Sequence, residues 1–567
     1  MHLLLAQKGA INEGDEAVDL GQSPGDIVFL SAADTELVSL AVANRAIDKD
    51  APSLRLANLQ QLSHPMSVDQ YVERTLSGAR LIVIRLLGGK SYWPYGLETV
   101  YALAQRKGIE LAVIPGDDKP DPLLSEYCTI GNEQQARMHA YLVEGGPENA
   151  SNFLRYCHHL LGEVSEPAGP APLIRAGLWF PELGVCSLEE IRAKWQPENP
   201  LVSICFYRAL VQSGGFEPVK HLVRSLSDRG LNALPVFVSS LKDPVSVETV
   251  RQIFGVASPE TVINLTGFAV SSPTGVSGST VLDENGAIVL QAVLAGGSRE
   301  AWETSSQGLS SRDLAMNVAL PEVDGRILSR AIAFKHAGQY DESVQANIVV
   351  HNPDVERTEF VCDLAANWVN LRRKQAGDRR VGIVLANYPN RDGRIGNGVG
   401  LDTPAGTINL LNALSDSGYE TGEIPPDGDA LIRQLLDGPT NAGFGGRKSA
   451  QTLGIDEYLQ FFRGLPAKVQ NQIQQRWGDP FDDQFFDNAG KCFALPVIRN
   501  GNVAIGIQPA RGYNIDPKQS YHSPDLVPPH GYLAFYCWLR NSFGADAVVN
   551  MGKHCNLEWL PGKALAL

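Results

Sequence analysis

A cluster of histidines and acidic side chains near the end of the sequence is the first candidate for chemistry. His554 and Glu558 are four residues apart, which on an α-helix would place both on one face. An imidazole beside a carboxylate can hold a divalent metal or move protons. Such pairs are also common on plain helix surfaces, and Pro561-Gly562 would end a helix at once. The same segment contains His522, His530, Asp516, Asp525 and Arg511.

A glycine-rich segment is the second candidate. We expect a strand to end at Tyr388 and a loop with glycines at positions 393, 396, 398 and 400 to follow. Thr403 is a typical N-cap and Pro404 suits the first turn, so a helix is expected from there to about Ser417. Exposed amides at such a helix start would favour an anion.

The ligand expected at this loop is a carboxylate. Arg391 and Arg394 add positive charge, but the glycine spacing does not match the dinucleotide fingerprint. The sequence also has no GxxxxGK[ST] motif, since Ile84 stands where Gly89-Lys90-Ser91 would need a glycine. We therefore favour substrate carboxylates over phosphates, and a tight turn without a ligand is the alternative.

Composition excludes several classes of protein. The chain has 567 residues, 44% hydrophobic and 20% charged, which is typical of a folded globular protein. A net charge of −15 disfavours binding to nucleic acid. The sequence contains no apolar run long enough for a membrane helix and no secretion signal, so we expect a cytoplasmic protein. Eight scattered cysteines without a CxxC pair argue against a disulfide framework or a thiolate metal site.

The elements that must position these residues alternate between short apolar strands and helices. The first strands are expected at 27–31, 53–57, 81–86 and 111–115, with helices such as 35–46 and 95–106 between them. This pattern predicts an α/β fold with several doubly wound, Rossmann- or flavodoxin-like domains and the beginning of a further mixed α/β domain.

Five segments are expected along the chain. Residues 1–125 form an amino-terminal α/β domain, and 126–195 form a helical stretch from about 133 to 161 with a proline-rich connection. A second α/β domain covers 196–375, with strands at 202–207, 233–238 and 262–264 and a helix at 218–229. A third unit with the glycine-rich loop covers 376–485, starting with a strand at 381–386. A last domain is expected to begin in 486–567, with two strands around an Asn-Gly turn near 500.

The sequence resembles the large subunit of aerobic cobaltochelatase, the CobN family, which is related to the large subunit of magnesium chelatase. The strings that carry the resemblance run nearly end to end: GDIVFLSAADTEL, VIRLLGGKSYWPYGLE, YLVEGGPENASNFLRY, SICFYRALVQSG, LNALPVFVSSLKDP, NYPNRDGRIGNGVGLDTPAG, QPARGY, PPHGYLAFYCWLR and GKHCNLEWLPGK.

The resemblance implies insertion of Co²⁺ into hydrogenobyrinic acid a,c-diamide during cobalamin synthesis. In that family the large subunit binds the tetrapyrrole, so the resemblance implies that the mixed α/β domain beginning in 486–567 is the catalytic, tetrapyrrole-binding domain. ATP, with Mg²⁺, is hydrolysed by a separate AAA+ subunit that acts with a third subunit carrying an integrin-like metal-binding domain. Cobalt is then a substrate metal, no covalently bound cofactor is expected, and the missing phosphate-binding motif fits this division of labour.

The resemblance also ranks the site residues. Glu558 has the place of an essential glutamate of the related magnesium-chelatase subunits and is the first candidate for catalytic base or metal relay. His554 follows, as the second metal ligand, and His530 is third. Candidates for the acetate and propionate side chains of the substrate are three guanidinium groups and the loop around the helix start: Arg511, Arg391, Arg394, Gly396, Asn397, Gly398 and Thr403.

Two departures from the family pattern affect these expectations. Cys555 stands where the family usually carries glycine, a position that can require positive φ or close approach to substrate. The family's chains are also about twice as long, so the chain resembles the amino-terminal part, and we expect it to be inactive alone. A magnesium chelatase subunit acting on protoporphyrin and a non-catalytic tetrapyrrole-binding module are the alternatives. All three interpretations place residue 558 on the floor of a cavity for a polyacidic macrocycle.

Overall fold

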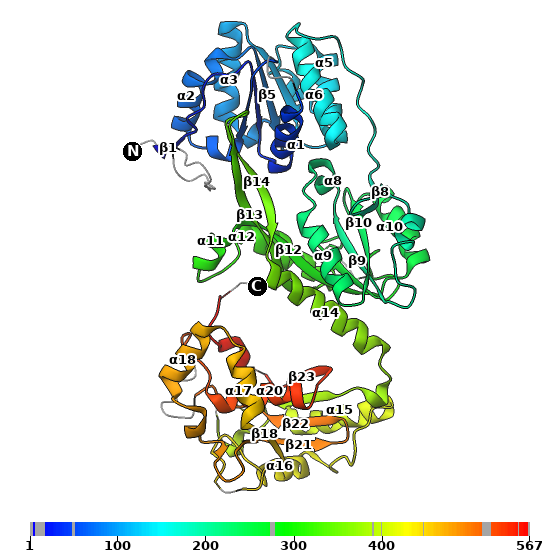
Figure 1. Ribbon diagram of the computed structural model, residues 1–567, viewed down its shortest axis with the longest axis vertical. Coiled ribbons are helices and arrows are strands. Elements are labelled where there is room, and N and C mark those ends of the chain that lie inside the picture. The colour runs from blue at the N-terminus through cyan, green and yellow to red at the C-terminus, as the bar shows by residue number, and fades with distance from the viewer. Residues whose placement is uncertain are drawn as a thin grey trace. The chain divides into compact units, whose positions relative to one another are not determined.

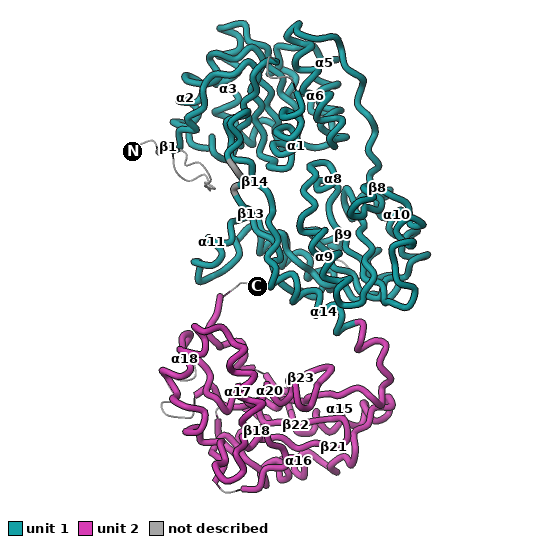
Figure 2. The backbone as a smooth tube through the Cα atoms, in the orientation of Figure 1, with its two compact units in different colours: residues 1–368, 565–567 teal, residues 369–564 magenta. Residues whose placement is uncertain are grey.

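The computed structural model describes residues 4–5, 17–47, 51–272, 278–387, 390–398, 400–445, 447–512, 523–553 and 555–564. The chain divides into two compact units, residues 1–368 with 565–567 and residues 369–564 (Figure 2). The boundary falls within the long helix α14, Val355–Arg373. Both units combine helices with parallel strands, which confirms the predicted α/β class. The five finer segments remain predictions.

Unit 1 contains two lobes, and the first is a doubly wound sheet (Figure 1). Its four strands are all parallel, in the order β4-β3-β5-β6. They are continuous apolar runs because helices cover both faces. The main elements are β3 Ile27–Ser31, β4 Leu54–Asn58, β5 Leu81–Leu86, β6 Glu110–Pro115, α1 Asp34–Arg45, α2 Pro65–Arg74, α3 Pro94–Lys107, α5 Asn132–Glu144 and α6 Gly146–Leu160. Shorter elements are β1 Leu4–Leu5, β2 Val18–Asp19 and α4 Pro122–Ser125.

The helical stretch expected from 133 to 161 consists of two helices. Helix α5 ends at Glu144 and α6 begins at Gly146. Gly145 and Gly146 both have positive φ, 64° and 86°, which breaks the helix there. Pro147 then lies in the first turn of α6, where its missing N–H is tolerated.

The second lobe is built on an eight-stranded sheet with the order β14-β13-β12-β11-β9-β10-β7-β8. The strands predicted at 202–207, 233–238 and 262–264 are found as its central members, and the last strands of the sheet were not predicted. The elements are β7 Ala176–Phe180, β8 Gly184–Cys186, β9 Leu201–Tyr207, β10 Asn232–Val238, β11 Thr261–Asn264, β12 Ile288–Ser298, β13 Ile327–Asp341, β14 Ala346–Pro353, α7 Leu188–Arg192, α8 Ala209–Ser213, α9 Glu217–Asp228, α10 Pro244–Ala257, α11 Arg299–Thr304, α12 Ser311–Asp313 and α13 Leu320–Val323.

The β13–β14 hairpin extends from the second lobe into the first (Figure 1). Val344 and Ile348 are buried in the apolar core of the first lobe. The backbone amide of Leu56, in β4, donates to the carbonyl of Val344 at 3.3 Å. An ion pair of 2.6 Å joins Lys335 on the hairpin to Asp34 at the start of α1. The two lobes are therefore fixed to one another by a buried hairpin as well as by the connecting chain.

Unit 2 is centred on a four-stranded sheet in the order β21-β22-β15-β23, in which β22 and β23 run parallel to β15 on either side. The predicted hairpin near residue 500 is found, with Asn500 paired to Val503 across the turn Gly501-Asn502. Its elements are β15 Val381–Leu385, β21 Val497–Asn500, β22 Val503–Ile507, β23 Ala547–Met551, α15 Thr403–Asp416, α16 Gly428–Leu436, α17 Ile455–Arg463, α18 Ala467–Trp477 and α20 His530–Cys537. A small antiparallel sheet adds β18 Gln451–Gly454, β20 Cys492–Leu495 and β19 Phe486–Asp487.

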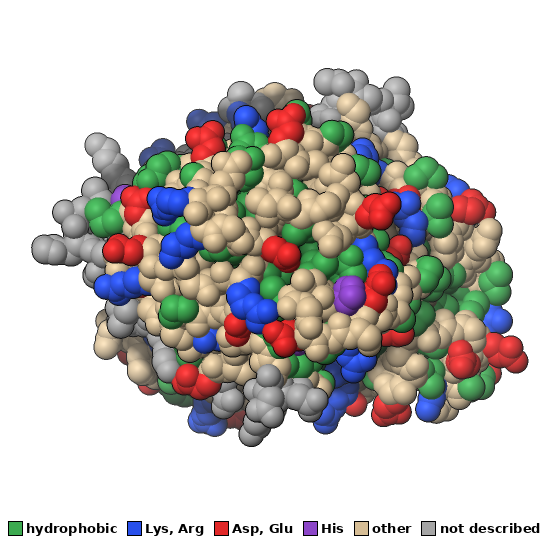
Figure 3. Space-filling view, turned by 90° about the horizontal axis from the view of Figure 1, so that it is seen from above, with side chains coloured by type: hydrophobic (Ala, Val, Ile, Leu, Met, Phe, Trp, Pro, Cys, Tyr) green, Lys and Arg blue, Asp and Glu red, His purple; other side chains and the backbone are tan. Residues whose placement is uncertain are grey.

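The surface carries both signs of charge. On the face that lies over the first lobe, acidic and basic side chains are interspersed (Figure 3). Among the helices of the described residues, none is both long enough and apolar enough to cross a membrane.

Candidate functional site

The carboxyl ends of three parallel strands meet at one edge of the sheet in unit 2. Leu385 at the end of β15 pairs with Ile507 at the end of β22 and with Met551 at the end of β23. The segments that follow these strands are residues 508–511, 386–403 and 552–559, and they hold most of the residues singled out from the sequence. In open α/β sheets this edge is where ligands bind.

The glycine-rich loop packs against the segment after β23. The amide of Gly396 donates to the carbonyl of Ala386 at 2.8 Å. The amide of Ala386 donates to the carbonyl of Met551 at 2.9 Å. A Cβ added at Gly398 would lie 3.6 Å from the backbone nitrogen of Lys553. Short strands β16, Asn397–Gly398, and β17, Leu401–Asp402, pair within the loop.

The helix after this loop begins as predicted at Thr403 but has a different cap. The carboxylate of Asp402 accepts the amide of Ala405 at 3.1 Å, so Asp402 is the N-cap, and Thr403 is buried in the first turn. The helix ends at Asp416, with Ser417 as its C-cap. The exposed Asp402 side chain therefore places a negative charge where the sequence predicted an anion site.

Arg391 and Arg394 are exposed beside the loop, and Arg394 Nη1 donates to Asn397 Oδ1 at 3.4 Å. Both guanidinium groups are therefore accessible to a ligand that approaches this edge. Tyr388, the predicted strand end, lies outside the described residues.

Glu558 lies in a short 3-10 helix, Asn556–Trp559, and its side chain is exposed. Cys555, directly before it, has extended backbone with φ −110° and ψ 129°. The α-helical spacing that would place residues 554 and 558 on one face is therefore not found. His554 and His522 lie outside the described residues.

Two buried amide side chains fix the turn that carries Glu558. The side chain of Asn556 donates to the carbonyl of Pro509 at 2.8 Å and accepts the hydroxyl of Tyr532 at 3.0 Å. Its backbone amide donates to Gln508 Oε1 at 3.3 Å, and Gln508 Nε2 lies 3.0 Å from the sulfur of Cys555. Sequence reasoning did not find Gln508 or Asn556, although Asn556 belongs to the string CNLEW that contains Glu558.

Arg511 is buried and bound to backbone. Its guanidinium donates to the carbonyl oxygens of Trp559 and Ser523, and burial lowers its pKa from the ordinary value. The side chain thus connects the end of the Glu558 turn to the segment before α20. In this arrangement it holds the turn in place and is not presented to a ligand.

His530, at the start of α20, is fully buried and bonded through both ring nitrogens. Nε2 lies 3.1 Å from the carbonyl of Gly478, which can only accept, so Nε2 carries the proton. Nδ1 then accepts the hydroxyl of Tyr458 at 2.6 Å. Burial lowers the pKa of His530, which keeps the ring neutral. The geometry gives His530 a structural role in the core beneath this edge.

The cavity expected around residue 558 stays a prediction. The three cavities that we describe are all lined by residues of unit 1, and Glu558 is exposed at the edge of unit 2. Among the described residues, no three His, Cys, Asp or Glu side chains gather closely enough to hold a metal ion.

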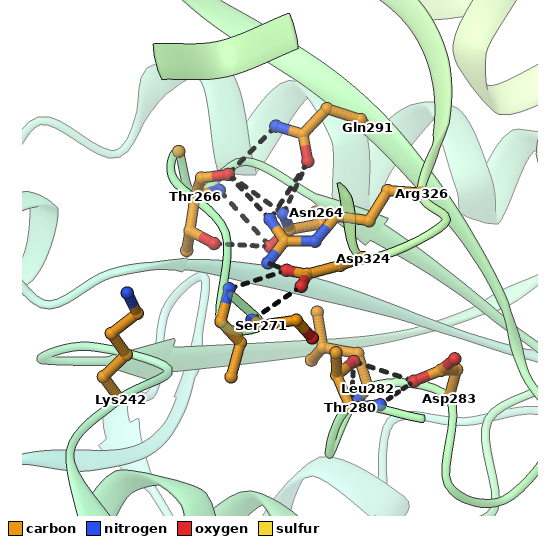
Figure 4. A network of polar contacts seen from close by, with 12 residues as sticks. Lys242, Asn264, Thr266, Ser271, Thr280, Leu282, Asp283, Gln291, Asp324 and Arg326 are labelled. Carbon is orange, nitrogen blue, oxygen red and sulfur yellow. Dashed lines mark hydrogen bonds and ion pairs between the residues drawn. The ribbon is translucent and has the colours of Figure 1, made fainter. Parts of the chain in front are cut away.

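A second group of polar side chains lies at strand ends in the second lobe of unit 1, and it is sealed from solvent (Figure 4). Arg326 pairs with Asp324 at 2.8 Å, and both side chains are almost fully buried. Asp324 also accepts the amides of Val270 and Ser271 at 2.8 and 2.9 Å. The amide side chains of Asn264 and Gln291, with the hydroxyl and carbonyl of Thr266, complete the network. None of these residues lines the three cavities, so the network fixes the loop after β11.

The comparison with known proteins places these features in a family. The family model described as CobN/Magnesium Chelatase matches residues 139–567. The aerobic cobaltochelatase subunit CobN of Sinorhizobium sp is 57% identical over the whole chain, which covers 45% of that protein. The subunit of the same name from Pseudomonas aeruginosa is 44% identical over the whole chain and is also covered to 45%.

A more distant relative and a solved structure support the same family. The chloroplastic magnesium-chelatase subunit ChlH of Oryza sativa subsp. indica is 26% identical over 79% of this chain and 33% of its own length. The catalytic subunit of cobaltochelatase from Mycobacterium tuberculosis superimposes with a TM-score of 0.69 at 31% identity, over 95% of this chain and 43% of that one. The chain thus spans about half the length of the curated relatives it matches. It belongs to the CobN/magnesium chelatase family.

Proposed function

We propose that this chain contributes to the large subunit of a cobaltochelatase that inserts Co²⁺ into hydrogenobyrinic acid a,c-diamide in the cytoplasm. ATP and Mg²⁺ are used by an AAA+ partner subunit, which acts with a subunit that carries an integrin-like metal-binding domain. Support for cobalt over magnesium comes from the two CobN relatives, at 57% and 44% identity, against 26% for the magnesium-chelatase relative.

The observation that carries this proposal is the convergence of three segments at the edge of unit 2. The strings NYPNRDGRIGNGVGLDTPAG, QPARGY and GKHCNLEWLPGK follow three neighbouring strands, β15, β22 and β23, whose carboxyl ends are in register. Segments that are far apart in the sequence thus present their polar groups to the same side of the sheet.

In this proposal Glu558 is the reactive residue at this edge. Metal insertion removes water from the cation and two protons from the pyrrole nitrogens. An exposed carboxylate can ligate the entering ion and accept protons. In this proposal His554 is the second metal ligand, and Asn556, Gln508 and Arg511 hold the turn that aims the carboxylate.

Recognition of the macrocycle falls to the glycine-rich loop. Arg391 and Arg394 are exposed there and match the acetate and propionate groups of the ring. The backbone from Gly396 to Thr403, with Asn397 and Gly398, is the surface on which these groups lie. Asp402 disfavours an anion at the helix start itself, so we assign the carboxylates to the guanidinium groups and not to the amides of α15.

A titration of the chain with tetrapyrroles, followed by the change in their absorbance, tests the proposal. We expect hydrogenobyrinic acid a,c-diamide to bind with a Kd at least about tenfold lower than that of protoporphyrin, because it carries more carboxylates and a less planar ring. Arg391→Gln with Arg394→Gln removes this preference, and Arg372→Gln, on the exposed side of α14, retains it.

Preference for protoporphyrin would support a magnesium chelatase subunit instead, which the 26% identity to the chloroplastic magnesium-chelatase relative favours as the second candidate. Tight binding of the corrin precursor with no metal insertion by the assembled complex would indicate a non-catalytic binding module, in line with Cys555 at the usual glycine position.

A further inference from the structure

A cavity of about 610 Å³ lies between the two lobes of unit 1, far in sequence from the segments discussed above. It is lined by the start of α1, by the ends of β5 and β6, and by the ends of β9 and β10 from the second lobe. In Figure 1, α8 of the second lobe lies beside α1 of the first, and contacts between the two helices enclose this region. The volume is typical of a small-molecule site.

The cavity lies at the switch point of the first sheet. The order β4-β3-β5-β6 means that the chain leaves β3 in one direction to form β4 and crosses to the other side to form β5. Loops after β3 and β5 therefore diverge and leave a crevice at their carboxyl ends, which is where doubly wound sheets bind ligands. Thr35 and Glu36 follow β3, and Arg85 lies at the end of β5.

Arg85 is the group that points to a ligand. Its side chain is 6% exposed, Nε pairs with Glu36 at 2.9 Å, and Nη2 donates to the carbonyl of Gly116 at 3.2 Å. Nη1 is buried and has no hydrogen-bond partner among the described residues. A buried donor without an acceptor is costly, so this N–H favours an oxygen supplied from the cavity.

The remaining charges of the cavity exclude an anionic ligand. Arg208 pairs with Glu144 at 3.1 Å, and Arg175 lies 3.3 and 3.4 Å from Asp118 and Asp243. Five carboxylates and three guanidinium groups line the cavity, which leaves an excess of negative charge. A phosphate or free carboxylate would be repelled, whereas a neutral oxygen is not.

Hydroxyl groups supply the other hydrogen-bonding positions. Thr35, Ser39, Ser239 and Ser240 line the same cavity. The hydroxyls of Ser39 and Ser239 donate to backbone carbonyls and can still accept a hydrogen bond from a ligand. A ligand that matches paired charges, several hydroxyl groups and the unused N–H donors of Arg85 Nη1 and Arg208 Nε is uncharged and carries several hydroxyl or carbonyl oxygens. We infer that this cavity binds an uncharged, polyhydroxylated small molecule of sugar or nucleoside size, with one oxygen on Arg85 Nη1.

Saturation-transfer NMR on the full chain tests this inference with adenosine, uridine and N-acetylglucosamine as uncharged probes and ADP and glutamate as anionic ones. At least one uncharged probe at about 1 mM is expected to receive saturation. Signal from the nucleosides alone or from the sugar alone identifies the source of the hydroxyl-rich ligand. The two anionic probes are expected to show none.

Two variants separate this cavity from other binding. Ser240→Phe fills the cavity and leaves its ion pairs intact, and Arg85→Met removes the Nη1 donor together with the ion pair to Glu36. Both are expected to abolish the signal, whereas Ser415→Phe, on the exposed face of α15 in unit 2, retains it. The inference is overturned if no uncharged probe is saturated, if only ADP or glutamate is, or if the signal persists in Ser240→Phe. Each result is independent of the tetrapyrrole titration, because the two cavity variants lie in unit 1 and the titration variants lie in unit 2.

Discussion

Polar side chains gather near strand ends in both units, but the two groups are built in opposite ways. In the second lobe of unit 1 the charged pair Asp324–Arg326 is sealed inside the protein and its oxygens accept amides of the adjoining loop. At the edge of unit 2 the charged groups Glu558, Arg391 and Arg394 are exposed, and the buried layer beneath them is made of neutral amides. A buried charge pair whose carboxylate accepts loop amides fixes a fold, whereas exposed charged side chains can be reached by a ligand.

The largest loss of stability is expected when the buried Asp324–Arg326 pair is broken. Asp324→Asn leaves the Arg326 charge buried without its counter-ion and is expected to lower the free energy of unfolding by about 3–5 kcal/mol. Denaturant unfolding monitored by circular dichroism measures this loss. Glu284→Gln, which breaks the exposed pair with Arg251 at 2.8 Å in the same lobe, is the matched control and should leave stability nearly unchanged. Equal losses of stability in the two variants would contradict the claim that the buried pair fixes the fold and the exposed pair does not.

A smaller loss is expected at the arginine beneath the edge of unit 2. Arg511→Met leaves the carbonyls of Trp559 and Ser523 unpaired and should cost about 2–3 kcal/mol. Hydrogen exchange should show faster opening of residues 556–559 than in the native chain. Arg499→Met, an exposed arginine of β21, is the control. Unchanged exchange in 556–559 would show that Arg511 does not position this turn.

The buried amide side chains of Gln508 and Asn556 are expected to contribute less to stability than Arg511. Gln508→Leu removes the acceptor of the Asn556 amide and the donor to Cys555, and should cost about 1–2 kcal/mol. Hydrogen exchange at Asn556 measures the effect directly. Gln474→Leu on α18 makes the same chemical change outside the edge and should leave that exchange rate unchanged.

The pH dependence of stability should reflect the buried histidine of unit 2. Burial holds the pKa of His530 below its unfolded value near 6.5, so the unfolded chain takes up the proton first. Stability is therefore full above about pH 6.5 and falls as the pH drops toward the folded pKa. His530→Gln should flatten this fall by at most about 1.4 kcal/mol per pH unit. The pH dependence of stability that remains in this variant is expected to come from His158 and His351, whose pKa values burial also lowers.

Unfolding curves of His530→Gln at pH 5.5 and pH 8 make this comparison. The difference between the two pH values should shrink relative to the native chain, while the loss at pH 8 reports only the missing bonds to Gly478 and Tyr458. An unchanged difference would mean that His530 is protonated equally in both states.

The strands that form the centres of the sheets could be predicted from sequence because they are short apolar runs bounded by turns. The predicted strands 27–31 and 81–86 agree with β3 and β5 residue for residue. Strand β13 was missed because polar side chains interrupt its sequence ILSRAIAFKHAGQYD, and what defines it is its pairing with β12 and β14. The helix start at 403 was found, but its cap was assigned one residue late.

The candidate site was predictable only in part, for a related reason. Charged residues in distinctive strings drew attention to Glu558, Arg391 and Arg394. The role of Arg511 depends on carbonyls 12 and 48 residues away, and the bond from Asn556 to Gln508 spans 48 residues, so no local spacing indicates either. The neutral state of His530 follows from Gly478 and Tyr458, which approach it only in the folded chain.

The rate of cobalt insertion by the complex assembled with its partner subunits, compared between Glu558→Gln and Glu423→Gln, tests the central proposal most directly. Both glutamates are exposed in unit 2, so neither substitution should change folding. The proposal predicts a loss of about 100-fold or more in Glu558→Gln, with tetrapyrrole affinity retained, and a native rate in Glu423→Gln. A native rate in Glu558→Gln would contradict the assignment of metal insertion to this edge.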